Sequence, residues 1–123
     1  MKSYTYLNQS KRLAEILPIE SADMRFCFSH TLGGRITGHY PMIGREPSMG
    51  TIPCWSLAAL LKVIPKHIKE CNTLRIDIGE KDFSIWYDEI GFGVNSDLPD
   101  ITMEEPIDAC YEMILKLYEL NLL

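Results

Sequence analysis

The sequence predicts an α+β fold, an antiparallel meander of three to five strands with two or three helices packed on one face. Residues 74–94 alternate apolar and polar side chains with a period of two, and turn residues interrupt the alternation at 79–82 and 88–89. Apolar side chains recur at helical spacing before and after this stretch. The chain of 123 residues fits a single domain, 1–123, which can bury a core without disulfides or metals.

A C-terminal helix is expected from Ile107 to Leu122. Its polar residues recur at helical spacing and leave one wide apolar side, and Pro106 suits the first helical position because a helix makes no use of that N–H. Thr102 with Glu105 also matches a capping box, which would start the helix earlier. The start of this helix therefore stays open by a few residues.

A middle helix is expected to begin after Ser56, a good N-cap residue, and to end before Pro65. Trp55 precedes the cap, where it can pack against Leu60 as a hydrophobic staple. We therefore interpret Trp55 as a core residue and not as a platform for a ligand.

Three strands are expected at 74–78, 83–87 and 90–94. The face that holds the apolar members of the alternation should lie under the helices. The opposite face should carry Arg75, Asp77, Ser84 and Trp86.

Trp86 is the unexpected residue on this nominally polar face. It could cover Gly91 and Gly93 on the next strand, pack under the N-terminal half of the chain, or be exposed for binding. The sequence does not choose between these three placements.

The N-terminal third predicts a short helix that ends at Pro18, then a strand at 24–28. Residues 29–52 are irregular, with five glycines and two prolines. Such a segment is typical of a binding loop or of disorder. Two short strands around Ile36 and Met42 are the structural alternative.

Charge is distributed unevenly along the chain. Residues 1–69 hold nine Lys and Arg against four Asp and Glu, whereas residues 70–123 hold three against thirteen, within a net charge of −5. The two halves could attract each other internally, or the acidic half could dock a protein partner with a basic surface. The candidate binding residues are Trp86, Asp88, Glu89, Arg35 and Tyr40.

The cysteines do not predict a metal site. Cys27, Cys54, Cys71 and Cys110 are scattered through the sequence and are expected to be reduced packing residues. Cys27-x-x-His30 supplies two zinc-type ligands, but no second close pair matches it. We expect no metal and no cofactor.

Other functional classes find little support. The glycines at 33–38 are not followed by the Lys-Ser/Thr and helix of a phosphate loop, and no Ser or Cys has a hydrolase signature around it. A pI near 5.1 disfavours nucleic-acid binding. The enzyme alternative is a small hydrolase or a metal-dependent enzyme that uses His30, His39 and Cys27.

No stretch of 18 apolar residues suggests a membrane span, and residues 1–8 do not read as a secretory signal. A cytoplasmic protein is expected.

Three stretches carry a resemblance: Ser21-Ala22-Asp23-Met24; Pro53-Cys54-Trp55-Ser56-Leu57-Ala58-Ala59-Leu60-Leu61 up to Pro65; and Pro106-Ile107-Asp108-Ala109-Cys110 with Glu112-Met113-Ile114-Leu115-Lys116-Leu117. They resemble uncharacterised small proteins from prophage-like and mobile regions of gut bacteria. The resemblance leaves out residues 29–52. It implies a mobile-element setting and no known activity.

We predict a non-enzymatic accessory or protein-interaction protein that acts through its acidic C-terminal half or through residues 29–52.

Overall fold

The computed structural model describes residues 1–30, 36–43, 51–69, 72–89, 93–94 and 97–123. In this part of the chain, α-helices and antiparallel sheets form an α+β fold, which confirms the predicted class. The elements in chain order are α1 (Leu7–Ala14), η1 (Ile19–Ser21), β1 (Met24–His30), β2 (Ile36–Ile43), β3 (Ile52–Cys54), α2 (Leu57–Val63), β4 (His67–Ile68), β5 (Asn72–Ile78), β6 (Phe83–Glu89), β7 (Gly93–Val94), β8 (Asp100–Met103) and α3 (Pro106–Glu119).

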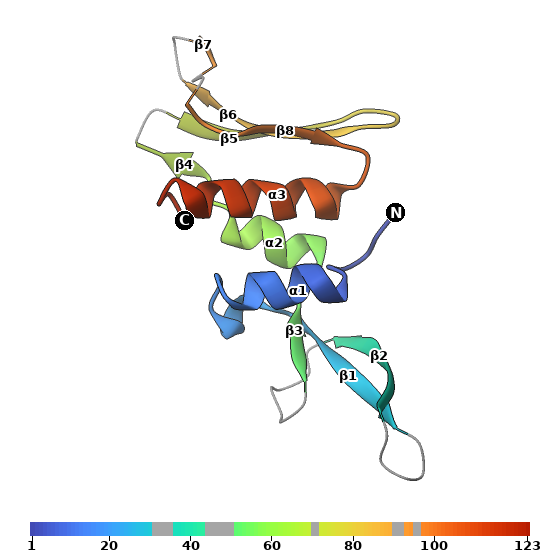
Figure 1. The fold of residues 1–123 in the computed structure, drawn as a ribbon. Helices are drawn as coiled ribbons and strands as arrows, with labels where there is room; N and C mark the ends of the chain where they lie inside the picture. Colours follow the sequence, from blue (N-terminus) through green and yellow to red (C-terminus); the bar gives the residue numbers. More distant parts are fainter. Residues whose placement is uncertain (31–35, 44–50, 70–71, 90–92, 95–96) are drawn as a thin grey trace.

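The elements are stacked in layers (Figure 1). A five-stranded sheet of β4 to β8 forms one end of the molecule, and α3, α2 and α1 follow in turn below it. A three-stranded sheet, in the order β2-β1-β3, forms the other end. The sequence predicted a single sheet, so the second, smaller sheet is a finding of the structure.

The large sheet is built around β6. Strand β5 pairs antiparallel with one edge of β6 along its whole length. The other edge is shared, because β7 pairs with the end of β6 at Glu89 and β8 pairs with its beginning at Phe83. Strand β4 adds two residues beyond β5.

Helix α3 supplies the centre of the hydrophobic core. It contacts β6 and β8 on one side and α2 on the other. Its buried residues are Pro106, Ile107, Ala109, Cys110, Met113, Ile114 and Leu117. Burying a large apolar side chain stabilises the fold by about 1.5–3 kcal/mol. Packing therefore outweighs helix propensity as the source of stability for α3.

The helix boundaries agree with most of the local signals. Helix α2 begins after Ser56, whose Oγ accepts the amide of Ala59 at 3.2 Å. Trp55 and Leu60 are both fully buried in the main core, as predicted. Helix α3 begins at Pro106 with Glu105 as its N-cap residue.

The alternative helix start at Thr102 is wrong, because residues 100–103 form strand β8. The three strands expected at 74–78, 83–87 and 90–94 did not include β8. Of the expected third strand, Gly93 and Val94 form β7, and residues 90–92 lie outside the described residues. Asp88, which the sequence placed in a turn at 88–89, lies within strand β6.

The predicted burial of the β5 face is also partly wrong. Phe83, Ile85 and Tyr87 of β6 are buried under α3, but Ile76 and Ile78 of β5 are 40% and 78% exposed. Their positions in the register lie on the helix side of the sheet. Helix α3 contacts β6 and β8, so its cover is centred away from β5.

The small sheet has a core of its own. Met24 and Phe26 of β1 pack with Cys54, and the rings of Tyr4 and Phe26 meet edge to face at 6.1 Å. Within the segment 29–52, residues 36–43 form β2, which supports the strand alternative for that part.

In the described residues, none of the helices is both long and apolar enough to cross a membrane.

The first prediction tests the core. Ile114→Ala should destabilise the protein by about 2–5 kcal/mol, because it opens a cavity in a fully buried site between the sheet and α2. The matched control is Ile19→Ala, a residue that is 42% exposed and should lose less than about 1 kcal/mol. Denaturant unfolding measures both, and equal losses would contradict the layered core.

Candidate binding surface

The face of the large sheet that points away from the helices is the candidate site, and we call it the outer face. The register sets its residues in rows across β5, β6 and β8. One row runs Asp77, Ser84, Thr102 and the next runs Arg75, Trp86, Asp100. Because side chains alternate along a strand, the burial of Ile85 and Tyr87 under α3 directs Trp86 outward.

Trp86 is held in place on this face. Its indole Nε1–H donates to Oδ1 of Asp88 at 3.1 Å, and Nε of Arg75 donates to Oδ2 of the same carboxylate at 3.2 Å. Asp88 therefore joins the indole and the guanidinium. The interaction fixes the indole without covering it, since Trp86 stays partly exposed.

A shallow hollow of about 410 Å³ lies beside Trp86. It is lined by Asp77, Ser84, Trp86, Asp100 and Thr102. The hydroxyls of Ser84 and Thr102 lie 2.8 Å apart and form a hydrogen bond across its floor. The described residues provide no ion-pair partner for Asp77 or Asp100, and both are exposed.

These groups suit the binding of a cation. The face of an indole attracts ammonium and guanidinium groups, and carboxylates on either side add ionic attraction. A carboxylic acid that catalyses proton transfer works best from a desolvated setting, whereas Asp77 and Asp100 face water. The hollow therefore offers recognition of a Lys or Arg side chain more readily than acid–base chemistry.

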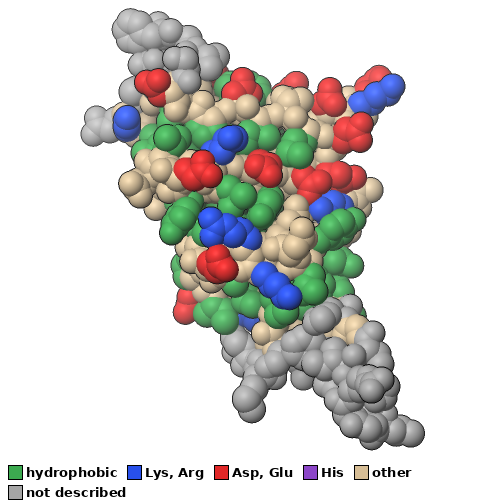
Figure 2. All heavy atoms as spheres, in the orientation of Figure 1, with side chains coloured by type: hydrophobic (Ala, Val, Ile, Leu, Met, Phe, Trp, Pro, Cys, Tyr) green, Lys and Arg blue, Asp and Glu red, His purple; other side chains and the backbone are tan. Residues whose placement is uncertain are grey.

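The charge asymmetry of the sequence is visible on the surface. On the face that Figure 2 shows, Asp and Glu side chains gather over the upper part of the molecule, on the sheet and the helical layer next to it, and several Lys and Arg side chains lie further down. In the described part of the chain, Lys2 and Asp108 form an ion pair that joins the two halves. The pairs Arg12–Glu15 and Arg75–Asp88 each stay within one half. Asp77 and Asp100 have no ion-pair partner among the described residues.

The structure separates the sequence-predicted binding residues. Trp86 and Asp88 lie together on the outer face, and the backbone of Glu89 pairs with Asn72 next to them. Tyr40 is 44% exposed on β2, at the opposite end of the molecule (Figure 1). Arg35 lies outside the described residues.

Of the three placements considered for Trp86, packing under the N-terminal half is wrong, because the elements of that half, α1, α2 and the small sheet, lie on the helix side of the large sheet (Figure 1). Gly93 pairs with Glu89, not with Trp86. Sequence reasoning missed Asp100 and Thr102, whose only signal was the short alternation Asp100-Ile101-Thr102-Met103.

The residues of the enzyme alternative lie on the ribbon of β1 and β2. Cys27 is buried and stands opposite Tyr40, while His39 stands opposite Phe28 and His30 opposite Ile36. In the register, Cys27 therefore has no histidine directly across from it. Within the described ranges, no three His, Cys, Asp or Glu residues gather in a way that could hold a metal ion.

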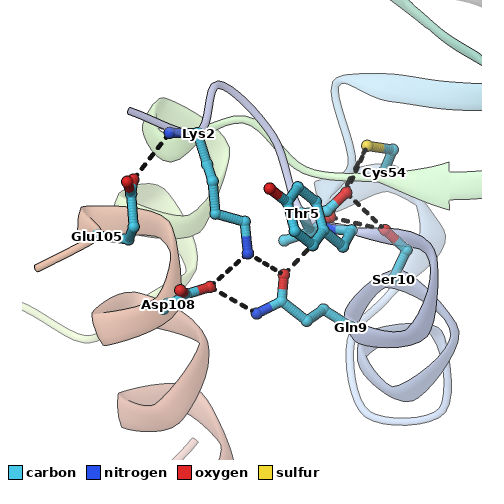
Figure 3. A network of polar contacts seen from close by, with 8 residues as sticks. Lys2, Thr5, Gln9, Ser10, Cys54, Glu105 and Asp108 are labelled. Carbon is cyan, nitrogen blue, oxygen red and sulfur yellow. Dashed lines mark hydrogen bonds and ion pairs between the residues drawn. The ribbon is translucent and has the colours of Figure 1, made fainter. Parts of the chain in front are cut away.

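A second polar cluster fastens the N-terminal segment to α3 (Figure 3). The Lys2 Nζ donates to Oδ1 of Asp108 at 2.5 Å and to Oε1 of Gln9 at 3.2 Å, and Gln9 Nε2 donates to Asp108 at 2.8 Å. The backbone N–H of Lys2 donates to Oε2 of Glu105 at 2.8 Å. We call these four residues the N-terminal clasp. It has a structural role, because every one of its charges has a partner.

Next to the clasp, Cys54 lies among the hydroxyls of Thr5 and Ser10 (Figure 3). It is fully buried, and burial raises the pKa of its thiol. Burial likewise raises the pKa of Cys110 to about 12. A nucleophilic cysteine needs the opposite shift. Both thiols are free, as is that of Cys27, while Cys71 lies outside the described residues.

Comparison with known protein families, with curated proteins and with solved structures found no match for this chain.

The second prediction concerns the clasp. Burial alone would raise the pKa of Asp108, but hydrogen bonds from Lys2 and Gln9 and the charge of Lys2 lower it below its ordinary value of 3.8. A carboxyl group whose pKa is lowered by folding stabilises the fold at pH values above its ordinary pKa. This stabilisation is lost as the pH falls through the folded-state pKa. Asp108→Asn should therefore cost about 1–3 kcal/mol at neutral pH and progressively less in acid.

The matched control is Glu15→Gln, which breaks the exposed pair with Arg12 and should change stability by less than about 1 kcal/mol. Thermal unfolding at a series of pH values measures both variants. The interpretation fails if Asp108→Asn is as stable as the wild type at neutral pH.

Proposed function

We propose that the protein is a non-enzymatic interaction protein that binds a basic segment of a partner protein on the outer face of its large sheet. The observation that carries the proposal is the hollow beside Trp86, where a fixed and partly exposed indole lies between the carboxylates of Asp77 and Asp100. A Lys or Arg side chain of the partner would occupy this hollow.

Charge on the outer face supports a cationic partner. Arg75 is paired with Asp88, so these two charges offset each other within the face. Asp77 and Asp100 then leave the face with net negative charge, in the half of the chain that holds thirteen Asp and Glu. Complementary charge of this kind speeds association and discriminates against acidic partners.

Three features favour binding over catalysis. The hollow is shallow and its carboxylates are exposed. The cysteine thiols in the described part of the chain are buried. The face also presents Trp86 on a rigid strand, and aromatic side chains of this kind are enriched at protein interfaces.

The biological setting is part of the proposal. We place the protein in the cytoplasm, in keeping with the free thiols of Cys27, Cys54 and Cys110. The resemblance to proteins of prophage-like and mobile regions suggests an accessory role in such an element.

The third prediction tests the hollow with a labelled penta-lysine peptide. The double variant Asp77→Asn with Asp100→Asn should weaken peptide binding by about 1–2 kcal/mol, roughly 5- to 30-fold, because it removes both free carboxylates beside Trp86. Fluorescence anisotropy at low salt measures the affinity. Asp88 is a poorer target, since its loss would also release Trp86 and Arg75.

The control is Glu80→Gln with Asp82→Asn, two exposed carboxylates in the β5–β6 turn that do not line the hollow. It changes the net charge equally and should lower the affinity less than twofold. Equal weakening by both double variants would show that the peptide responds to net charge alone and would overturn the proposed site.

A further inference from the structure

Strand β5 has an edge that is mostly open. Strand β4 covers that edge only at Asn72 and Thr73, and Lys66 extends the cover by one hydrogen bond, from the Leu74 amide to the Lys66 carbonyl at 2.9 Å. Within the described part of the chain, no strand pairs with residues 75–78 on that side. A free strand edge is a template for pairing with another chain.

The direction of the backbone groups follows from two hydrogen bonds. The Leu74 amide points to the β4 side, whereas the Gly79 amide bonds the Asp82 carbonyl across the hairpin with β6. Backbone groups alternate between the two edges along a strand. The amides and carbonyls of Ile76 and Ile78 therefore point to the open edge, and those of Arg75 and Asp77 point to β6.

The side chains of the same two residues are apolar and exposed. Ile76 is 40% and Ile78 is 78% exposed, and both lie on the helix side of the sheet beyond the cover of α3. The free backbone groups and the exposed apolar side chains thus belong to the same residues. Proteins usually protect such an edge with charge, a bulge or a covering element.

We propose that a second copy of this chain covers the edge, so that β5 pairs antiparallel with β5 of the partner around a two-fold axis beside Asp77. This register places Ile76 opposite the partner's Ile78, and the symmetry repeats the contact. Each Ile76–Ile78 pair exchanges two backbone hydrogen bonds. The register does not use Leu74, whose amide is already bonded to Lys66.

Charge on the outer face is compatible with this register. The two Asp77 side chains stand opposite each other, but Arg75 of each copy lies diagonal to the partner's Asp77, within reach of a long side chain. Each Arg75 is also paired with Asp88 of its own copy, so the outer face along the edge keeps a net negative charge, which weakens the dimer. The strand edge is thus self-complementary in its hydrogen bonds and its apolar contacts. The paired stretch is short, so the dimer is expected to form and dissociate with concentration.

Sedimentation of the full chain tests the proposal across roughly 1 µM to 1 mM protein. The wild type, with a mass of 14.1 kDa, should shift toward twice that mass as its concentration rises. Ile78→Lys should weaken dimerisation at least tenfold, because it sets a charge against the partner's Ile76. The matched control is Ile19→Lys on η1. Ile19 is 42% exposed, close to the 40% of Ile76, and this variant should dimerise like the wild type.

Amide hydrogen exchange in the same samples locates the contact. The amides of Ile76 and Ile78 should become protected as the concentration rises, whereas those of Arg75 and Asp77, which face β6, should be protected throughout. A wild type that stays monomeric at the highest concentration would overturn the proposal. Equal weakening of the dimer by Ile78→Lys and Ile19→Lys would also overturn the proposal. Neither variant alters the hollow beside Trp86, so this result is independent of peptide binding.

Discussion

The burial of helix α3 between the large sheet and α2 is the constraint on which the rest of the structure depends. Its apolar residues contact β6 and β8 on one side and α2 on the other, so the helix belongs to two layers at once. Because one side of β6 must face this helix, the alternate residues of β6 must face outward. The outer position of Trp86 is therefore a consequence of how α3 packs.

The same constraint explains why the candidate binding surface lies on the sheet. Helices occupy one side of the sheet, the small sheet is stacked beyond them, and the N-terminal segment runs beside the helices (Figure 1). The N-terminal clasp, which ties Lys2 to Asp108 and Glu105, strengthens this stack at the start of α3. The basic half of the chain is thus kept away from the outer face, and Asp77 and Asp100 face solvent.

The limited width of the helical layer has a second consequence. Helix α3 covers β6 and β8 but leaves Ile76 and Ile78 of β5 exposed at an open edge. The proposed pairing of two β5 edges would align the outer faces of two copies. A dimer built in this way would present two copies of the hollow on one continuous sheet, which favours a partner with repeated basic residues.

Elements with a strong local period could be predicted from the sequence. The apolar side of α3, the cap at Ser56 and the alternation through β5 and β6 each follow from a few neighbouring residues. Strand β8 has four residues, and Thr102 with Glu105 resembles a helix cap, so the local signal favoured the wrong element. Missing β8 also hid Asp100 from the site, because only pairing with β6 brings it beside Trp86.

The exposure of Ile76 and Ile78 could not be read from the sequence for a different reason. Their alternation matches that of a buried strand face, and it is identical in kind to that of Phe83 and Ile85. Whether such a face is covered depends on where a helix from a distant part of the chain is centred. That position is a property of the tertiary packing and leaves no local pattern.

A nuclear magnetic resonance titration with the penta-lysine peptide tests whether the outer face recognises cationic side chains. The Trp86 indole N–H and the amides of Ser84 and Thr102 should shift together and saturate, while residues of β2 and of the N-terminal clasp stay unchanged. Shifts centred on β2 or on the clasp, or none at all at high peptide concentration, would contradict this recognition.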